Sequence, residues 1–412
     1  MQAYHTSLRS RSAEETLRIA KLYASRYGIT RVTETTRLDK IGVPVCASIR
    51  PDASLSSLCV CAGKGLLPIE ARVGAYMEAI EFALSDPRYS QASYAMGKVK
   101  DVLDVADRPE SILDFCPKMG VDIGLDDLTA VSEAEELIHG GQSLVPSELV
   151  FMPFDPPSGL ARLFGSHTNG LASGNNLEEA TLHGTLEVVE RDILSFRTVD
   201  RRSVRVLPDS YPPLIKEIDD KIRQAGLELI VNWVPSAWEL PFFAATLLDT
   251  STMNPMYINA GYGCHFRKSI AMMRAVTEAI QSRMTFIHGG RDDVIDDYRR
   301  FAGLTEIEKA ARFKKSAAHY RQFETAEEYD SIPEPAWQFP SVEAYLRQLL
   351  SHLHGRGIDH VLRVAHTQKS EEIQVVKVIV PKLEFFTAQN TRLGPRLRDH
   401  AQKMTDDFVR RT

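Results

Sequence analysis

The sequence predicts an α+β protein, with an α/β arrangement as the alternative, because helix-like and strand-like segments alternate along its 412 residues. Three observations support this prediction. Short β-branched runs bounded by Pro and Gly are typical of strands. Apolar residues at helical spacing, often preceded by capping residues, indicate helices between those runs. One acidic helical pattern also occurs three times, which indicates an internally repeated unit.

The first helix is predicted from its two ends. Ser12 and Glu15 form a capping-box pattern, and Gly28 suits the left-handed position just after a helix. The other elements expected in this part of the chain are strands at 43–49 and 55–61 and a long helix at about 68–84.

A central helix follows a loop that contains Gly170 and Gly174, where the backbone can turn sharply or approach a ligand closely. Asn175 is the predicted N-cap of this helix, and Glu178, three residues later, completes a pattern that resembles a capping box. A strand is expected shortly before the loop, at 149–154.

The second half of the chain continues the alternation. Helices are expected at 214–224, 269–287, 341–354 and 393–412, and strands at 227–233, 242–248, 256–260, 360–364 and 373–379. We expect one domain over residues 1–412, with a mixed subregion at 101–145. Residues 294–340, which are charged and interrupted by Pro, are expected to form an irregular excursion on the surface.

Composition excludes several classes of protein. With 43% hydrophobic and 25% charged residues, the chain is an ordinary globular protein with a large core. A net charge of -6 and a pI near 6.1 give no general basic surface for nucleic acid. The N-terminus has no apolar signal segment, and no apolar run is long enough to span a bilayer. We therefore expect a cytoplasmic protein without nucleic-acid or membrane partners.

The five cysteines indicate reduced thiols, because an odd and sparse set does not suit a disulfide framework. Cys59 and Cys61 have strand spacing, so both thiols point to one face. A metal site there is the weaker interpretation, since no second Cys or His pair has the spacing of a zinc finger. We expect two half-buried core thiols.

The acidic pattern consists of a small residue, an acid seven positions later, and an acid or amide three positions after that. Its three instances are Ala71, Glu78 and Glu81; Ala180, Glu187 and Glu190; and Ala271, Glu278 and Gln281. Any one such pair is usually a solvated helix face. The apolar residues beside these acids, and the threefold occurrence, favour helices that face one another and bring the acids together.

On the central helix, Glu179 also lies on the same side as Glu187 and Glu190, so a positive group is needed between them. Hard divalent cations take oxygen ligands, and Mg²⁺ binds through carboxylates together with substrate phosphates. The guanidinium groups of Arg191, Arg274 and Arg283 can supply forks for phosphate oxygens.

Other parts of the sequence also fit a nucleotide. Asn175 and the Gly174 amide stand at a helix N-terminus, which favours anions. The chain has no Gly-x4-Gly-Lys-Ser/Thr motif, so this is a nucleotide site without a P-loop. Lys64, between Gly63 and Gly65, either reaches a phosphate or is an exposed turn lysine.

Two other metal or acid chemistries fit less well. A di-iron site of the ferritin type needs Glu-x-x-His on its helices, and these helices carry Glu-x-x-Glu instead. His183 lies one turn before Glu187 and could be a ligand, although a core or surface histidine is the commoner case. A glycosidase needs two acids only, which leaves the other acids and the arginines unexplained.

These segments together resemble the YcaO superfamily. The segments that carry the resemblance are 168–180 with 186–192 as its central motif, 77–81 as its first acidic helix, 274–283 with 290–293 as its third motif, and 38–45 with 63–65 in its N-terminal part. The likeness extends from about residue 31 to about 396. It implies a fold of mixed and antiparallel sheets packed by helices around a central ATP and Mg²⁺ site.

The resemblance also implies an activity. Enzymes of this family use ATP and Mg²⁺ to phosphorylate the oxygen of a peptide backbone amide after a nucleophile adds to its carbon. A neighbouring Cys, Ser or Thr side chain then gives an azoline, sulfide gives a thioamide, and an amine gives an amidine. Catalysis by such an enzyme consists mainly of positioning and charge neutralisation.

The family pattern assigns roles to residues of this chain. The expected metal or nucleotide ligands are Glu78, Glu81, Glu179, Glu187, Glu190 and Glu278. The expected ATP contacts are Lys64, Asn175, Arg191, Arg274 and Gln281, joined by Arg283 from the reasoning on phosphate forks. Arg191 and Arg274 are also the expected catalytic cations, and no general base can be assigned.

The chain departs from the family pattern at Gly74, where many relatives have Ser, and at Phe82, where many have Arg. The C-terminus lacks the Pro-rich tail of azoline-forming members, and no peptide-clamping domain precedes the motifs, so we expect a stand-alone catalytic domain. Segments 378–384 and 392–396 look like the ending of members that work with a TfuA-type partner, which favours thioamide formation.

The expected partners are therefore a ribosomal precursor peptide or protein as substrate and a TfuA-like or leader-binding protein, and the chain is expected to form a homo-oligomer. The main alternative is a non-catalytic scaffold that presents peptide within a modifying complex. The retained acids and arginines count against it, because an uncompensated buried ion costs several kcal/mol. A metal-dependent hydrolase that needs no ATP is a weaker alternative.

Overall fold

The computed structural model describes residues 2–3, 6–387 and 391–411. The chain divides into two compact units, each built from separated segments. Unit I contains Glu81–Arg201 and the chain from Gln338 onward, and unit II contains Gln2–Ile80 and Arg202–Trp337. The prediction of one catalytic domain over residues 1–412 stays a prediction beside this division.

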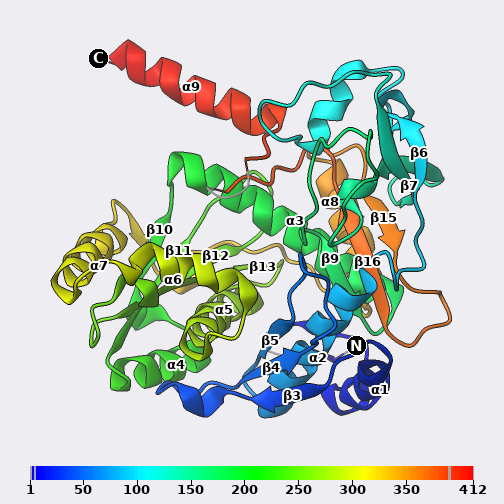
Figure 1. The fold of residues 1–412 in the computed structure, drawn as a ribbon. Coiled ribbons are helices and arrows are strands. Elements are labelled where there is room, and N and C mark those ends of the chain that lie inside the picture. Colours follow the sequence, from blue (N-terminus) through cyan, green and yellow to red (C-terminus); the bar gives the residue numbers. More distant parts are fainter. Residues whose placement is uncertain (1, 4–5, 388–390, 412) are drawn as a thin grey trace. The chain divides into compact units, whose positions relative to one another are not determined.

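Unit II contains a small antiparallel sheet in the order β3-β4-β5 (Figure 1). Its strands are β3 (Arg31–Glu34), β4 (Val45–Ile49) and β5 (Val60–Lys64), and the helices of this region are α1 (Ala13–Arg26) and α2 (Pro68–Leu84). A two-stranded ladder joins β1 (Gln2–Ala3) and β2 (Leu8–Arg9). Ser12 accepts the Glu15 N–H at the start of α1, and Gly28 follows its end at φ 70°, as predicted.

The larger sheet of unit II has the order β13-β12-β11-β10-β14. Its strands are β10 (Val204–Val206), β11 (Leu227–Trp233), β12 (Phe242–Asp249), β13 (Ile258–Cys264) and β14 (Ala326–Glu327). All neighbouring strands are antiparallel except β10 and β14. The helices of this part are α4 (Pro213–Gln224), α5 (Lys268–His288), α6 (Ile295–Ala302) and α7 (Glu306–Arg321).

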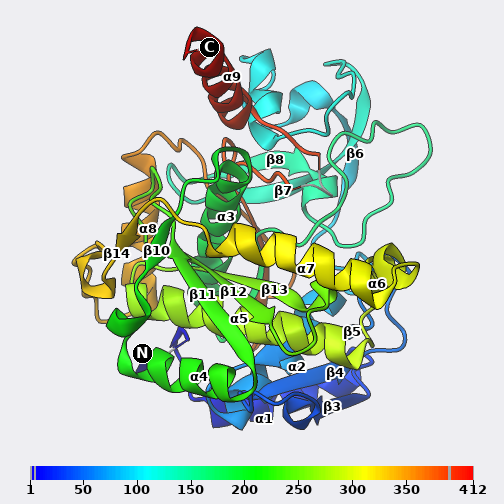
Figure 2. The ribbon, with the colours of Figure 1, turned by 90° about the vertical axis from the view of Figure 1, so that its left-hand side faces the viewer.

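Strand β11 shows how the larger sheet is covered on two sides (Figure 2). Its residues Leu229 and Val231 belong to a core that also contains the buried residues of α4 and α5. Ile230 points to the opposite face, where it joins Phe313 and Ala317 of α7. This alternation follows from the period of two in a strand, so β11 is apolar on both faces.

Unit I contains a sheet in the order β6-β7-β15-β16-β9, with β8 also pairing with β7. The strands are β6 (Ala95–Lys98), β7 (Leu128–Glu136), β8 (Gln142–Pro146), β9 (Leu171–Gly174), β15 (Leu362–Ala365) and β16 (Gln374–Ile379). Its helices are α3 (Leu177–Asp200), α8 (Val342–His354) and α9 (Pro395–Arg411). Helix α3 packs on β9 and β16, and α8 packs on α3.

A strand, a short connection and a long helix form a unit that occurs three times, as β5–α2, β9–α3 and β13–α5. Gly63 of β5 lies so close to α2 that an added Cβ would be 2.1 Å from Ala71 O and from Ala75 N. Gly263 of β13 lies in the same way under α5, with an added Cβ 2.1 Å from Ala271 O. The internal repeat predicted from the acidic pattern is thus a repeat of structure.

The predicted α+β class is confirmed, and so are most of its helices. In the described part of the chain no helix has both the length and the apolar character needed to cross a bilayer. Three strand predictions are wrong in detail. No strand forms at 149–154, where a short 3-10 turn at 147–149 is followed by irregular chain. Strands β5 and β13 begin later than predicted, because turns lie within 51–57 and a 3-10 turn occupies 255–257.

The excursion at 294–340 is the largest local error. It contains two ordered helices, α6 and α7, although the sequence predicted irregular structure. Thr305 and Glu308 form a capping box at the start of α7, and Phe313 is buried in the core beneath it. Most residues of α7 face solvent and many are charged, so its few buried apolar residues give only a weak helical period in the sequence.

Candidate functional site

Glu78 lies on α2 and points back to the preceding strand. Its Oε2 accepts a hydrogen bond from the Ala62 N–H of β5 at 2.8 Å. Burial raises the pKa of this carboxyl, and the nearby charges of Arg291 and Lys64 act in the opposite direction. A nearby cation stabilises the charged form of such a carboxyl group, which burial disfavours.

Glu278 occupies the matching position on α5, where its Oε1 faces the Tyr262 N–H of β13 at 3.4 Å. Its Oε2 also accepts a hydrogen bond from Lys64 Nζ at 2.7 Å, and both side chains are largely buried. Lys64 is therefore a paired lysine at the end of β5 and not an exposed turn residue. Gln281, one turn after Glu278, donates its amide Nε2 to Ala62 O at 2.7 Å.

Arg274 lies one turn before Glu278 on α5, directly beside Gly263. Its Nε is buried and has no hydrogen-bond partner in the structure. Burial, together with the charges of Arg274 and Arg267, holds the pKa of His265 well below its ordinary value, so this imidazole stays neutral. A buried guanidinium N–H without an acceptor fits a place for an anionic ligand.

Arg283, further along α5, is placed differently from Arg274. Its guanidinium pairs with Asp39 at 3.1 Å and with Asp249 at 3.0 Å, and all three side chains are almost fully buried. Tyr257 also faces this guanidinium, 5.2 Å from its ring centroid. These contacts give Arg283 a structural role, and its predicted contact with a nucleotide stays a prediction.

In unit I, Glu81 makes the contact that corresponds to that of Glu78. Its Oε1 accepts hydrogen bonds from the Ser173 N–H at 2.8 Å and from Ser173 Oγ at 2.5 Å. Ser173 belongs to β9, the strand that leads into α3. The sequence predicted a loop between Gly170 and Gly174, but residues 171–174 form β9, and the contact of the Ser173 hydroxyl was therefore missed.

Asn175 and Glu179 form a buried pair at the start of α3. The Asn175 amide Nδ2 donates to Glu179 Oε1 at 3.0 Å, and both residues are at most 5% exposed. The N-cap itself is Asn176, whose side chain accepts the Glu179 N–H at 2.8 Å. The predicted N-cap at Asn175 is wrong by one residue. The Asn176 side chain caps the helix, from an extended backbone, while the Asn175 side chain binds the Glu179 carboxylate.

Glu187, Glu190 and Arg191 follow on α3. Glu190 is 2% exposed, whereas Glu187 and Arg191 are partly exposed. Lys377 of β16 is fully buried, and burial lowers its pKa to about 7, although the charge of Glu187 partly offsets this effect. Lys377 was missed from the sequence, although a lone lysine in the apolar run 375–380 was the available signal.

Arg291 lies in the motif segment 290–293, but no role was assigned to it from the sequence. It pairs with Asp293 in two hydrogen bonds of 2.7 and 2.6 Å. Its pKa is raised although burial acts to lower it, because Asp293 and Glu78 both favour the charged form. None of the five cysteines is in a disulfide, as predicted. Cys59 is half-buried beside Asp292, as expected, whereas Cys61 is buried.

The residues fit Mg²⁺ and phosphate by their chemistry. Carboxylate oxygens are hard ligands, Glu179 and Glu190 are buried, and Arg274 offers a buried N–H group without a partner. Across the described ranges, no three His, Cys, Asp or Glu side chains are grouped closely enough to hold a metal ion by themselves. Mg²⁺ commonly takes only one or two carboxylates and completes its shell with phosphate and water, so its ligands need no such group.

Comparison with known proteins agrees with the resemblance seen in the sequence. The model of the YcaO cyclodehydratase family, described as ATP- and Mg²⁺-binding, matches residues 62–384. An uncharacterized protein of Methanothermobacter thermautotrophicus is 36% identical over 394 residues, which cover 93% of this chain and 97% of that protein. An uncharacterized protein from the tfuA 3′ region of Rhizobium leguminosarum bv. trifolii is 28% identical, over 90% of this chain and 87% of its own length.

Two solved structures share the fold. YcaO from Methanopyrus kandleri, bound with AMPPCP and Mg²⁺, is 23% identical with a TM-score of 0.75, over 95% of this chain and 96% of that one. A heterocyclase in complex with substrate and cofactor is 19% identical with a TM-score of 0.73, over 96% of this chain and 56% of that one. At these identities the likeness concerns the fold, and it confirms the fold that the resemblance implied.

Proposed function

Because the chain belongs to the YcaO family, whose cofactors are ATP and Mg²⁺, we propose that it is an ATP-dependent enzyme that activates a backbone amide of a ribosomally made peptide or protein. The observation that carries this proposal is the threefold strand–helix repeat, because it places partly or fully buried acids at equivalent positions of its helices. Glu78 and Glu278 each face the backbone N–H of their own preceding strand. A solvated acidic face would not be fixed in this way.

The chemistry explains why a nucleotide is needed. An amide oxygen is a poor leaving group, and ATP with Mg²⁺ supplies the phosphoryl group that makes it a good one. The protein then has to hold the reactants in line and to neutralise charge. Under this proposal the metal ligands are drawn from Glu78, Glu81, Glu179, Glu187, Glu190 and Glu278.

The proposed phosphate contacts come from the positively charged side chains Arg274, Lys64 and Arg191. Arg274 has a buried Nε without a partner, which suits it to a phosphate oxygen. Lys64 is held by Glu278 at 2.7 Å, so a phosphate that binds Lys64 would have to share it with this carboxylate. Arg191 and Gln281 complete the proposed contacts, and Asn175 holds Glu179 in place from inside the fold.

Binding of Mg·ATP by purified variants tests the site. Glu187→Gln, Glu190→Gln and Arg274→Ala are each expected to weaken binding in calorimetry by at least about tenfold, because each removes a charge that faces the ligand. Glu228→Gln is the matched control, since this partly exposed carboxylate pairs with Arg321 and is not among the proposed ligands. Unchanged binding in all three variants would show that the assigned residues are not the site.

The product is proposed from sequence features of the C-terminal part and from one relative. The relative from the tfuA 3′ region favours a TfuA-like partner and therefore a thioamide product, with azoline or amidine as the other outcomes. Incubation of a candidate peptide with the enzyme, partner, ATP and sulfide should replace one oxygen by sulfur in the mass spectrum. Loss of water would indicate ring closure or an amidine.

Turnover separates the enzyme from the scaffold alternative. A protein that binds Mg·ATP but converts neither ATP nor peptide, with its partner and cognate peptide present, would be a presenting scaffold. The homo-oligomeric state and the cytoplasmic location predicted from the sequence stay predictions.

A further inference from the structure

A polar pocket lies in unit I. Its lining residues come from other segments of the chain than the proposed nucleotide ligands. We call it the Asp114 pocket, and its lining residues are Leu103, Asp104, Arg108, Ser111, Asp114, Phe115, Asp359, His360, Pro381 and Lys382. The empty space between its lining residues is about 270 Å³, which includes open solvent, and only a small part of it is enclosed. This space suits the end of one side chain better than a whole nucleotide.

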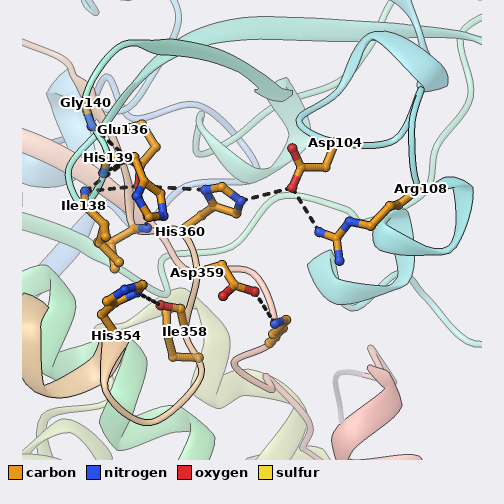
Figure 3. A network of polar contacts seen from close by, with 12 residues as sticks. Asp104, Arg108, Glu136, Ile138, His139, Gly140, His354, Ile358, Asp359 and His360 are labelled. Atoms are coloured by element: carbon orange, nitrogen blue, oxygen red, sulfur yellow. Dashed lines mark hydrogen bonds and ion pairs between the residues drawn. The ribbon is translucent and has the colours of Figure 1, made fainter.

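Most charges in the lining are already paired with one another (Figure 3). Asp104 Oδ2 accepts hydrogen bonds from Arg108 at 2.9 Å and from His360 Nε2 at 3.0 Å. Asp359 pairs with Lys382 at 2.5 Å. The two cations of the pocket are therefore neutralised by two of its three carboxylates.

Two polar groups of the lining are left over. Ser111 is 4% exposed, and its Oγ has no hydrogen-bond partner in the structure. The Asp114 carboxylate makes no hydrogen bond or ion pair within the described ranges of the chain. Burial raises its pKa, although the charges of Lys382 and Arg108 act against this effect.

The backbone holds these groups in a fixed arrangement. Asp104 and Lys382 have φ angles of 59° and 75°, a left-handed conformation that residues other than glycine adopt only when their surroundings impose it. The Lys382 N–H also donates to Asp114 O at 2.7 Å, which ties the segment after β16 to the 3-10 helix that carries Ser111 and Asp114. The pocket is thus preorganised.

Glu136, on the far side of His360, does not change this charge balance. Its carboxylate accepts the N–H groups of Ile138, His139 and Gly140, so it is satisfied by backbone donors. His360 Nδ1 lies 3.9 Å from Glu136 Oε1. The lining has three carboxylates beside the cations Arg108 and Lys382, and Asp114 is the carboxylate that neither of them pairs with.

We propose that the Asp114 pocket binds the end of one arginine or lysine side chain of the peptide that the enzyme modifies. The Asp114 carboxylate and the buried Ser111 hydroxyl, both without a partner, are acceptors for N–H donors, and an unpaired carboxylate favours a donor that carries a positive charge. An anion would meet the unpaired Asp114 and gain no free cation in return. The peptide as the source of the cation rests on the proposed function, whereas the cation-binding chemistry does not.

The test uses small probes and the full chain. N-acetyl-arginine N-methylamide and its lysine counterpart should bind in ligand-observed NMR, and the neutral citrulline counterpart should not. Asp114→Asn should weaken the binding of both cationic probes by about tenfold, because a charge-assisted hydrogen bond is lost. Asp122→Asn, which removes an exposed carboxylate outside the pocket, should leave their binding unchanged.

Ser111→Ala gives a second variant that removes the other acceptor, and it keeps the test valid if Asp114→Asn does not fold. Equal binding of the citrulline probe, or undiminished binding in both pocket variants, would refute the proposal. Binding of free methylguanidinium without binding of either amino acid probe would refute the side-chain source. Mg·ATP binding by the wild-type chain, measured in parallel, tests the proposed function separately, since the two sites share no residue.

Discussion

Single acids in this protein differ in what holds them, although the sequence presents them as copies of one pattern. Glu78 and Glu81 accept backbone N–H groups of strands, whereas Glu278 is held chiefly by the ammonium group of Lys64. Glu179 accepts the side-chain amide of Asn175. A carboxylate that is held by a fixed backbone donor keeps its position when a ligand leaves, which favours preorganisation.

The adjacent asparagines before α3 should have separable effects. Asn176→Ala removes the N-cap bond to the Glu179 N–H and should lower the free energy of unfolding by about 1 kcal/mol. Asn175→Ala leaves the cap intact but removes the hydrogen bond from Asn175 Nδ2 to the Glu179 carboxylate, so it should chiefly weaken Mg·ATP binding. Denaturant unfolding and calorimetry on both variants check this. The reverse assignment of the two effects would contradict the cap at Asn176.

The buried His366 should lower the free energy of unfolding as the pH falls. Burial, with a contribution from the charge of Lys377, lowers the pKa of His366 to about 3, whereas an unfolded histidine titrates near its ordinary value. Between these two values the unfolded chain binds a proton that the folded chain does not, so stability falls as the pH falls through this window. From pH 7 to pH 5 this one group should cost roughly 2 kcal/mol.

His366→Gln should therefore lose less stability than the wild type between pH 7 and pH 5, as measured by urea unfolding at each pH. The matched control is His319→Gln, because His319 is exposed on α7. This control should keep the full wild-type pH dependence. Identical slopes for wild type and His366→Gln would mean that His366 accepts a proton in the folded state.

At the scale of elements, the strand–helix repeat explains why glycine is needed in β5 and β13. An added Cβ at Gly63 would be 2.1 Å from two backbone atoms of α2, which no rotation of a side chain can relieve. Gly63→Ala must therefore move the helix away from the strand and should destabilise the protein by about 1–3 kcal/mol. Thermal and denaturant unfolding measure this loss.

Gly303→Ala is the control for this prediction, since it has a negative φ of -86° and nothing within 4 Å of an added Cβ. It should be neutral or slightly stabilising, because alanine reduces the entropy of the unfolded chain. The Ala62 N–H to Glu78 bond is formed at the same strand, so Gly63→Ala should also weaken Mg·ATP binding. Equal stability of the two variants would contradict the close strand–helix contact.

The elements that the sequence predicted well are those with both a strong period and clear ends. Helix α5 was predicted within one residue at each end, because Gly289 stops it and its apolar face is continuous. Helix α7 was missed because its exposed charges outnumber its buried residues. The acids were found from their spacing, whereas Lys377 and Ser173 were not, because contacts between strands and helices are not visible in local spacing.

For the whole molecule, each compact unit is assembled from two stretches of chain that are far apart in sequence. The proposed ligands are divided between them. Unit I contributes Glu81, Asn175, Glu179, Glu187, Glu190 and Arg191, and unit II contributes Lys64, Glu78, Arg274, Glu278, Gln281 and Arg283. Tests of the nucleotide site should therefore use the full chain. A fragment that contains only one of the two stretches of a unit would lack part of the core of that unit.

A non-hydrolysable nucleotide should stabilise the full chain only when Mg²⁺ is present. A ligand at about a hundred times its Kd adds about 2.7 kcal/mol to the free energy of unfolding, which a thermal melt detects. Mg·AMPPCP should raise the Tm, and EDTA should abolish the rise, because without the cation the acids repel the triphosphate. Glu187→Gln and Glu278→Gln, one from each unit, should both reduce the rise, whereas Glu228→Gln should not. A rise that persists in EDTA, or that either acid variant leaves intact, would mean that the nucleotide binds without the metal ligands assigned to that unit.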